Sequence, residues 1–263
     1  MNPMAEWIAD HALLSWALLL TLALLGGDLA WQHNARWHRR APRLGHAPTV
    51  LRWQIGVLLL LALALCFVAV ALAIFDLQDT ALAGFDASLA EDLRDRLPLP
   101  VLRLIAMITR LGDPLWVTVV ACLMLSLLLL RRHWQLAVVW AVALLGILPI
   151  NGSLKALFRR MRPLHDHGFV IEPGWSFPSG HAFGAVVFYG MLAYVLLRLT
   201  PRFHRAIIAA TMLLIGVVGI SRVLLQVHYF SDVLAGYTAG AAWLVLCMGA
   251  AEILRGPTTR TTP

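Results

Sequence analysis

The sequence predicts an all-α, polytopic transmembrane helix bundle, and three observations support this prediction. Sixty per cent of the 263 residues are apolar. Only 13% are charged, and the mean hydropathy is +0.77. The apolar residues also fall in runs of about 20, the length that crosses the hydrocarbon core of a bilayer. A soluble globular protein cannot bury so much apolar surface, so we expect a membrane protein.

Seven apolar runs are expected to span the membrane, and together they organise the chain. They are residues 12–31, 52–75, 114–130, 134–154, 181–198, 206–221 and 229–252. The first is not expected to be a cleaved signal peptide, because Glu6 and Asp10 precede it and its basic residues follow it. We therefore expect an N-terminal helix with a basic cytoplasmic loop (1–50), a six-helix membrane domain (51–254) and a short cytoplasmic tail (255–263).

The positive charge is expected to orient the spans rather than to bind nucleic acid. The formal net charge is +7, and the single lysine among the 21 basic residues is Lys155. Most arginines follow the first, third, fifth or seventh span: Arg36, Arg39, Arg40, Arg43, Arg52, Arg131, Arg132, Arg198, Arg202, Arg205, Arg255 and Arg260. Because basic loops stay in the cytoplasm, these connections are cytoplasmic and the N-terminus is outside. We expect the protein to lie in a bacterial inner membrane. We expect no nucleic-acid partner.

Residues 76–113 form the longest segment on the opposite side. They contain seven acidic residues and four arginines. Two prolines and the periodic run Val101, Leu104, Ile105, Ile108 predict short amphipathic helices on the membrane surface. The segment has no catalytic pattern, so we expect a solvated extracytoplasmic cap.

One basic stretch contradicts this charge distribution. Residues 155–162 carry four positive charges on the side that should have few. The stretch either belongs to a functional site or anchors the protein to phospholipid head groups.

Three short blocks lie at span ends on that same side. The first is Lys155-x6-Arg162-Pro163, the second is Phe177-Pro178-Ser179-Gly180-His181, and the third is Ser221-Arg222-x5-His228-x3-Asp232. Arginine forks and a lysine ammonium bind phosphate oxygens. Ser179 can cap a helix whose free N–H groups, beside Gly180, favour an anion. The blocks therefore predict a pocket for a dianionic group, most simply phosphate.

Two histidines in these blocks can carry acid–base or nucleophilic chemistry. His228 and Asp232 lie one helical turn apart and share a face. A carboxylate on one ring nitrogen fixes the tautomer and leaves the other nitrogen free to react. His181 is suited to protonating a leaving oxygen. Together these groups are what phosphoryl transfer through a covalent intermediate requires.

A metal site is the alternative to this chemistry. His181, His228 and Asp232 provide three ligand types, and His165, Asp166 and His167 form a local cluster. Three nearby cations would repel a divalent ion and already neutralise phosphate charge, so we expect neither a metal nor another cofactor. The cluster at 165–167 is expected to be a solvated loop or a substrate rim.

The three blocks, in this order, resemble the signature motifs of the type-2 phosphatidic acid phosphatase superfamily. The resemblance covers about residues 150–235 and implies a six-helix core, with the first span as an addition. It implies that His228 is the nucleophile, that Asp232 holds it, and that His181 protonates the leaving group and later activates water. It also implies phosphoryl binding by Lys155, Arg162, Ser179, Gly180 and Arg222, without a metal. The soluble or secreted vanadate-dependent haloperoxidases of the superfamily do not fit a chain with these spans.

The position of the blocks implies the substrate class. A phosphate site at the outer ends of membrane helices is accessible to a lipid phosphate moving laterally in the bilayer. Undecaprenyl diphosphate, phosphatidylglycerol phosphate, phosphatidic acid and lipid A phosphates all qualify, and we favour undecaprenyl diphosphate or a broad specificity. One alternative is a phosphotransferase that passes the phosphoryl group to another lipid such as lipid A. The other is a transporter, which is disfavoured because its ionisable groups would lie near the bilayer midplane. The sequence leaves the oligomeric state open.

Overall fold

The computed structural model describes residues 3–40, 53–75, 80–164, 168–200 and 203–254. Every regular element in these ranges is a helix. Seven of the described helical segments are long and apolar enough to cross a membrane. The expected all-α transmembrane bundle is therefore confirmed, and the chain is a multi-pass membrane protein.

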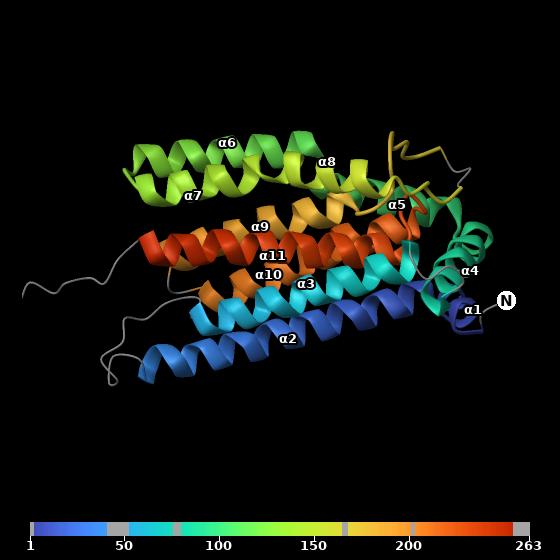
Figure 1. Ribbon diagram of the computed structural model, residues 1–263, viewed down its shortest axis with the longest axis horizontal. Coiled ribbons are helices and arrows are strands. Elements are labelled where there is room, and N and C mark those ends of the chain that lie inside the picture. Colours follow the sequence, from blue (N-terminus) through green and yellow to red (C-terminus); the bar gives the residue numbers. More distant parts are fainter. Residues whose placement is uncertain (1–2, 41–52, 76–79, 165–167, 201–202, 255–263) are drawn as a thin grey trace, which may run out of the picture.

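The long helices run side by side along one axis (Figure 1). They are α2 (Ala12–Arg40), α3 (Trp53–Phe75), α6 (Pro114–Leu130), α7 (Trp134–Leu145) with α8 (Ile147–Phe158), α9 (Gly180–Leu199), α10 (His204–Leu224) and α11 (Phe230–Leu254). In this view α6 and α7–α8 form one side, α2 and α3 form the other, and α9 to α11 lie between them. Helix α2, the first span and the expected addition to a six-helix core, packs against α10.

Helix α9 is the centre of the bundle. It packs against α10 and α11, and most of its residues are buried inside the protein. Its buried face carries Phe183, Phe188 and Tyr194, which belong to the largest core cluster. The outer helices instead expose leucines such as Leu58 and Leu123. In a bilayer these leucines contact lipid chains, so their exposure carries no penalty.

The expected spans match the helices except at some of their ends. The fourth is interrupted at Gly146, where a Cβ would lie 2.5 Å from the ring of Trp243, so only glycine lets α11 approach this closely. The helix then continues as α8 to Phe158, four residues beyond the expected end at 154. Lys155 is therefore a helical residue rather than the first residue of a loop.

Short helices cover one end of the bundle, and we call this end the cap. It contains α1 (Pro3–Asp10), α4 (Ala81–Arg96), α5 (Leu99–Ile108) and a 3₁₀ turn, η2 (Thr109–Gly112). Apolar side chains of α1 and α4 pack together, among them Ala5, Ala9, Leu89 and Leu93. The short helices expected within 76–113 are thus present, although on α5 the buried residues are Leu102 and Ile105 while Leu104 is exposed.

The cap is not the purely solvated layer that its composition suggests. Asp86 of α4 is only 1% exposed and Thr109 of η2 only 2%. A carboxylate buried this deeply must have polar partners. The partners described below belong to the candidate site, so the expectation of a wholly solvated cap is wrong for Asp86 and Thr109.

A glycine pair on α11 lets α9 approach closely. A Cβ at Gly236 would lie 2.6 Å from the backbone oxygen of Ser179, and one at Gly240 would lie 2.8 Å from that of Phe183.

We expect Gly236→Ala to lower stability by about 1–3 kcal/mol, because the helices must separate to admit the methyl group. Gly249→Ala is the matched control, since a Cβ there meets nothing within 4 Å. Melting midpoints in detergent measure the stability of both variants. If Gly236→Ala melts at the same temperature as Gly249→Ala, α9 and α11 do not pack this closely at Gly236.

Candidate active site

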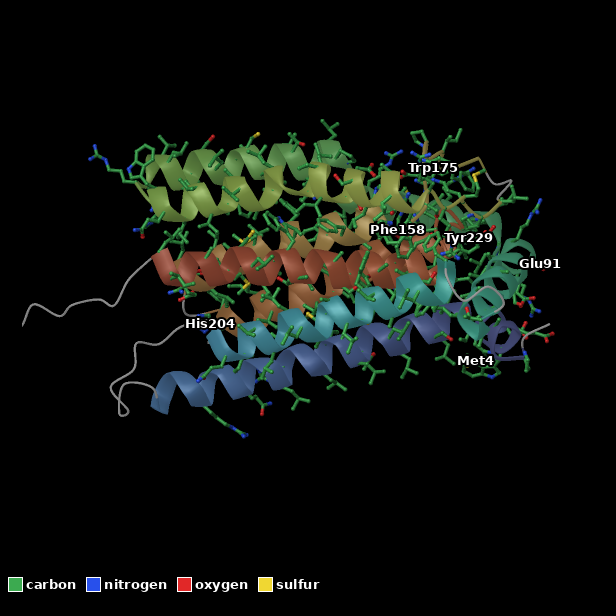
Figure 2. All side chains as sticks on the ribbon, in the orientation of Figure 1. Met4, Glu91, Phe158, Trp175, His204 and Tyr229 are labelled. Carbon is green, nitrogen blue, oxygen red and sulfur yellow. The ribbon has the colours of Figure 1, made fainter. Side chains whose placement is uncertain are left out.

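The three sequence blocks converge at the cap end of the bundle. Lys155 comes from the end of α8, Ser179 and His181 come from the start of α9, and the third block joins the end of α10 to the start of α11. In Figure 2, Trp175 and Tyr229 lie toward this end, with Glu91 of α4 beyond them. His204 lies at the opposite end. The blocks, distant in sequence, therefore form one site.

His228 is positioned by the turn between α10 and α11. Gln226 adopts a left-handed conformation with φ of +52°, and this reverses the chain direction. The backbone N–H groups of Val227 and His228 both donate to the carbonyl oxygen of Arg222, at 3.2 and 3.3 Å. The ring is only 2% exposed. Burial lowers the pKa of His228 to about 4, against attraction by Asp232, so the imidazole is neutral near pH 7.

The two ring nitrogens of His228 face different partners. Nδ1 lies 3.3 Å from the hydroxyl oxygen of Ser176 and 3.5 Å from Oδ2 of Asp232. Nε2 lies 3.1 Å from Nη1 of Arg162. A neutral imidazole with a proton on Nδ1 presents the lone pair of Nε2 to the cationic side of the site.

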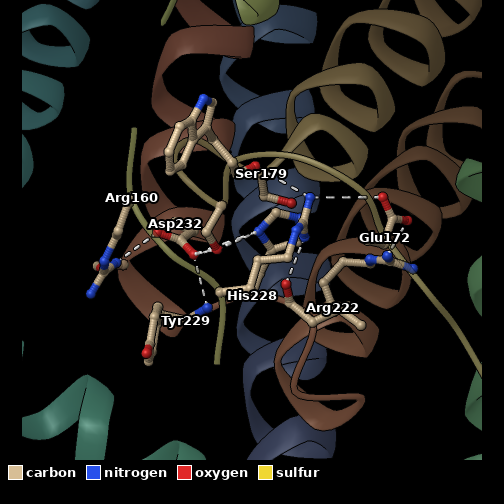
Figure 3. A network of polar contacts seen from close by, with 12 residues as sticks. Arg160, Glu172, Ser179, Arg222, His228, Tyr229 and Asp232 are labelled. Atoms are coloured by element: carbon tan, nitrogen blue, oxygen red, sulfur yellow. Dashed lines mark hydrogen bonds and ion pairs between the residues drawn. The ribbon is translucent and has the colours of Figure 1, made fainter. Parts of the chain in front are cut away.

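Asp232 is held by several donors (Figure 3). Arg160 Nη1 donates to Oδ1 at 2.6 Å. The hydroxyl of Ser176 and the backbone N–H of Tyr229 donate to Oδ2 at 2.5 and 2.9 Å. The carboxylate is completely buried. These bonds fix its orientation beside His228, although the direct contact between the two side chains is longer than a hydrogen bond.

Arg160 connects Asp232 to the cap. Its Nη2 donates to Asp86 at 2.9 Å, and its guanidinium lies 4.1 Å from the centre of the Tyr229 ring. Asp86 also accepts from the backbone N–H and the hydroxyl of Ser231. One arginine thus links two buried carboxylates, an arrangement that compensates both charges. The basic stretch 155–162 therefore serves the site through Lys155, Arg160 and Arg162.

Three cations lie in the site near His228. Arg162 donates to the carbonyl oxygens of Val227, Gly174 and Trp175, at 2.7, 3.0 and 3.2 Å. Lys155 donates to that of Trp175 at 2.6 Å. Arg222 is fully buried, donates to the Thr109 hydroxyl, and keeps Nε without a partner. Carbonyl oxygens carry only partial charge, so Lys155 and Arg162 retain positive potential for an anion, whereas Arg222 also pairs with the carboxylate of Glu172.

The start of α9 completes the anion-binding geometry. Ser179 is the N-cap, and its side-chain oxygen accepts from the N–H of Ala182. Its own backbone N–H donates to the carbonyl oxygen of Asp232 at 2.9 Å. Gly180 is the first residue of the helix, and a Cβ there would lie 3.0 Å from the side chain of Asn151. The first-turn N–H groups of a helix favour negative charge, so the start of α9 contributes to an anion site.

His181 lies between two carboxylates. Its Nε2 is 3.2 Å from Asp113, which precedes α6, and its Nδ1 is 3.5 Å from Glu172. Glu172 also accepts from Nη2 of Arg222 at 2.5 Å. Sequence reasoning did not identify Asp86, Asp113, Arg160, Glu172 or Ser176. Arg160 lies within the basic stretch 155–162, whose unexpected charge is a signal that could have identified it. The acidic residues are single residues in long connecting segments, and no sequence pattern marks them as part of a site.

A cavity of about 490 Å³ extends from this site between α6 and α7–α8. Its walls are mostly apolar and include Val117, Leu125 and Leu144. Lys155, Glu172, His181 and His228 lie among its lining residues and supply most of its ionisable groups. A polar end joined to an apolar body matches an amphiphile with an anionic head.

The residues suited to a metal ion do not form a cluster. No group of three or more His, Cys, Asp or Glu side chains with metal-site geometry occurs within the described ranges. His181 contacts Asp113 and Glu172, whereas His228 contacts Ser176 and lies close to Asp232. His165, Asp166 and His167 lie outside the described residues.

The burial of His228 predicts a pH-dependent stability. Its pKa is about 4 when folded and 6.5 in a solvated chain, so the unfolded state binds more protons between these values. Stability should therefore fall as the pH is lowered through this window, by up to about 3 kcal/mol from this group. We expect melting midpoints measured at about pH 7 and about pH 5 to differ less for His228→Asn than for the wild type. If the melting midpoint changes by the same amount between the two pH values in His228→Asn and in the wild type, His228 is not a buried neutral imidazole.

Comparisons with known proteins give a consistent result. The sequence model of a family described as the PAP2 superfamily matches residues 134–253. Lipid A 1-phosphatase of Rhizobium johnstonii is 32% identical over 236 residues, covering 81% of this chain and 84% of that protein. Phosphatidylglycerophosphatase B of Bacillus subtilis is 37% identical over 110 residues, which cover 40% of this chain and 53% of that protein, about half its length.

A solved structure resembles the fold as well. It is described as the crystal structure of the first transmembrane PAP2 type phosphatidylglycerolphosphate phosphatase from Bacillus subtilis. The TM-score is 0.67 at 27% sequence identity, and the match covers 74% of this chain and 96% of that one.

Proposed function

Because the chain is a membrane phosphatase that belongs to the PAP2 superfamily, we propose that it hydrolyses a phosphomonoester or diphosphate of a membrane lipid. The reaction takes place on the extracytoplasmic face of the bacterial inner membrane, through a phosphohistidine intermediate. The observation that carries this proposal is the union of the buried His228 with three cations and an apolar cavity.

The first step forms a bond from Nε2 of His228 to phosphorus and breaks the bond to the leaving oxygen. Arg162, Arg222, Lys155 and the first turn of α9 stabilise the charge on the phosphoryl oxygens. His181 gives a proton to the leaving oxygen. Asp232, through its hydrogen-bond network, orients the imidazole and stabilises its positive charge.

The second step releases phosphate. His181, which has lost its proton, accepts one from water, and the resulting hydroxide attacks phosphorus as the bond to Nε2 breaks. His228 returns to the neutral form that its burial favours. The protein side chains supply each proton transfer and each compensating charge, so the proposal requires no metal or other cofactor.

The cavity supports a lipid as the substrate. An acyl or prenyl chain fits its apolar walls while the phosphate reaches the polar end. The relatives named above act on lipid phosphates according to their names, and the candidates are phosphatidylglycerol phosphate, phosphatidic acid, undecaprenyl diphosphate and a lipid A phosphate. The cytoplasmic position of the arginine-rich connections supports an extracytoplasmic site at the other end.

A phosphate-release assay on these four lipids tests the proposal. Purified protein in excess chelator should release inorganic phosphate from at least one of them, and a labelled phosphoryl group should appear in water. Label that moves to lipid A instead would establish the phosphotransferase. Lipid uptake into liposomes without hydrolysis would favour the transporter, and no turnover of any lipid phosphate would overturn the proposal.

A further inference from the structure

A carboxylate lies where the proposed phosphate-binding cations converge. Glu172 belongs to the segment between α8 and α9 and is in none of the three blocks. Its Oε1 is 2.5 Å from Nη2 of Arg222 and 3.5 Å from Nδ1 of His181, and its Oε2 is 3.9 Å from Nη2 of Arg162 (Figure 3). One side chain thus contacts three groups that would hold a phosphoryl group.

Glu172 is charged in this position. Burial raises the pKa of its carboxyl, but the electrostatic interactions with Arg222, His181, His228 and Arg162 outweigh burial and hold the pKa below its usual range. Arg222 has no exposed surface, and the other groups that face its guanidinium are Thr109, Asp113 and Arg162. An anion in this place compensates a buried charge that would otherwise be costly.

Glu172 and a phosphate dianion cannot share these partners. Both would use Nη2 of Arg222 and the same side of His181, and like charges at such a distance repel strongly. The carboxylate also lines the cavity beside Lys155 and His228, so it stands in the path of a phosphate entering from the apolar side.

We propose that Glu172 competes with phosphate for Arg222 and His181 and thereby weakens retention of the phosphate product. It holds these cations in the substrate-free enzyme, moves aside when a phosphoryl group binds, and returns as phosphate leaves. This inference rests on the proposed function, because it assumes that Arg222 and His181 bind the phosphoryl group.

The competition favours release of the product. A site with three cations and a helix N-terminus would bind inorganic phosphate tightly and release it slowly. The carboxylate weakens the binding of every phosphate equally, and a lipid phosphate regains affinity through its chain in the apolar cavity. Inorganic phosphate has no such contact, so in the presence of Glu172 it is bound weakly and leaves.

Glu172→Gln tests this competition in the full-length protein in detergent. The amide keeps a hydrogen-bond acceptor for Arg222 but removes the charge. We expect the inhibition constant and the calorimetric dissociation constant of inorganic phosphate to fall about tenfold. Glu172→Ala should tighten phosphate binding in the same direction if the glutamine variant does not fold. Glu91→Gln, an exposed acid on α4, is the matched control and should leave both constants unchanged.

The outcomes are separate from those of the proposed function. Phosphate binding needs no turnover, so it can be measured whether or not a lipid is hydrolysed. Unchanged or weaker phosphate binding in both Glu172 variants overturns the inference, even if the wild type remains an active phosphatase. A purely structural role would lower the melting midpoint without tightening phosphate binding, and this result also overturns it.

Discussion

Replacing His228 with asparagine is expected to reduce phosphate release by about 10⁴-fold or more, the scale on which loss of a catalytic nucleophile usually acts. Asparagine keeps an amide near the position of Nδ1, where Ser176 lies 3.3 Å away, but has nothing in place of Nε2. The nitrogen beside Arg162 is therefore lost while most of the packing is kept. Initial rates of phosphate release from a lipid phosphate measure the effect.

His133→Asn provides the matched control for this variant. His133 is an exposed residue in the turn between α6 and α7, at the opposite end of the bundle from the cap. Its replacement should leave the rate unchanged, because it contacts none of the site. A His228→Asn enzyme that keeps more than a small fraction of the wild-type rate, with an unchanged melting midpoint, would contradict the nucleophilic role.

The second large effect is expected for Asp232→Asn, with a loss of about 10³-fold in kcat/KM. Arg160 and Ser176 both donate to this carboxylate, so an amide group must present N–H to one of these donors or lose one of its bonds. The imidazole would also lose the charge that stabilises it when it carries the phosphoryl group. We expect the loss to lie mainly in kcat.

Asp28→Asn is the matched control for the second variant. Asp28 of α2 pairs with Arg205 at 2.6 Å, where the arginine is exposed and distant from the cap. Exposed pairs contribute little, so the rate should change less than about twofold. A change of only a few-fold for Asp232→Asn would show that the carboxylate does not support the reaction.

Much of the fold could be predicted because membrane spans are determined by simple properties. A run of apolar residues of the right length must form a helix in a bilayer, since no water satisfies its backbone groups. The helix ends were less predictable: α8 continues past the apolar run because Lys155 and its neighbours extend toward the cap. The interruption at Gly146 depends on the Trp243 ring of another helix, which local sequence does not reveal.

The candidate site divides in the same way. His228, Asp232, His181 and Ser179 lie at helix starts or turns, where spacing alone predicts their shared faces. Asp113 and Glu172 are different, because each depends on how a connecting segment folds over the bundle. Asp86, which pairs with Arg160 of the basic stretch, likewise depends on how the cap folds over the bundle.

Trapping the phosphoenzyme tests the central claim most directly. A phosphate ester with an acidic leaving group needs little help from His181, so His181→Asn should form the intermediate and then hydrolyse it slowly. We expect acid-labile, base-stable label from the phosphate to accumulate on the peptide that contains His228, and to be absent when His228→Asn is added to the same chain. Label on another residue, or rapid phosphate release without any labelled protein in the His181 variant, would contradict a phosphohistidine at His228.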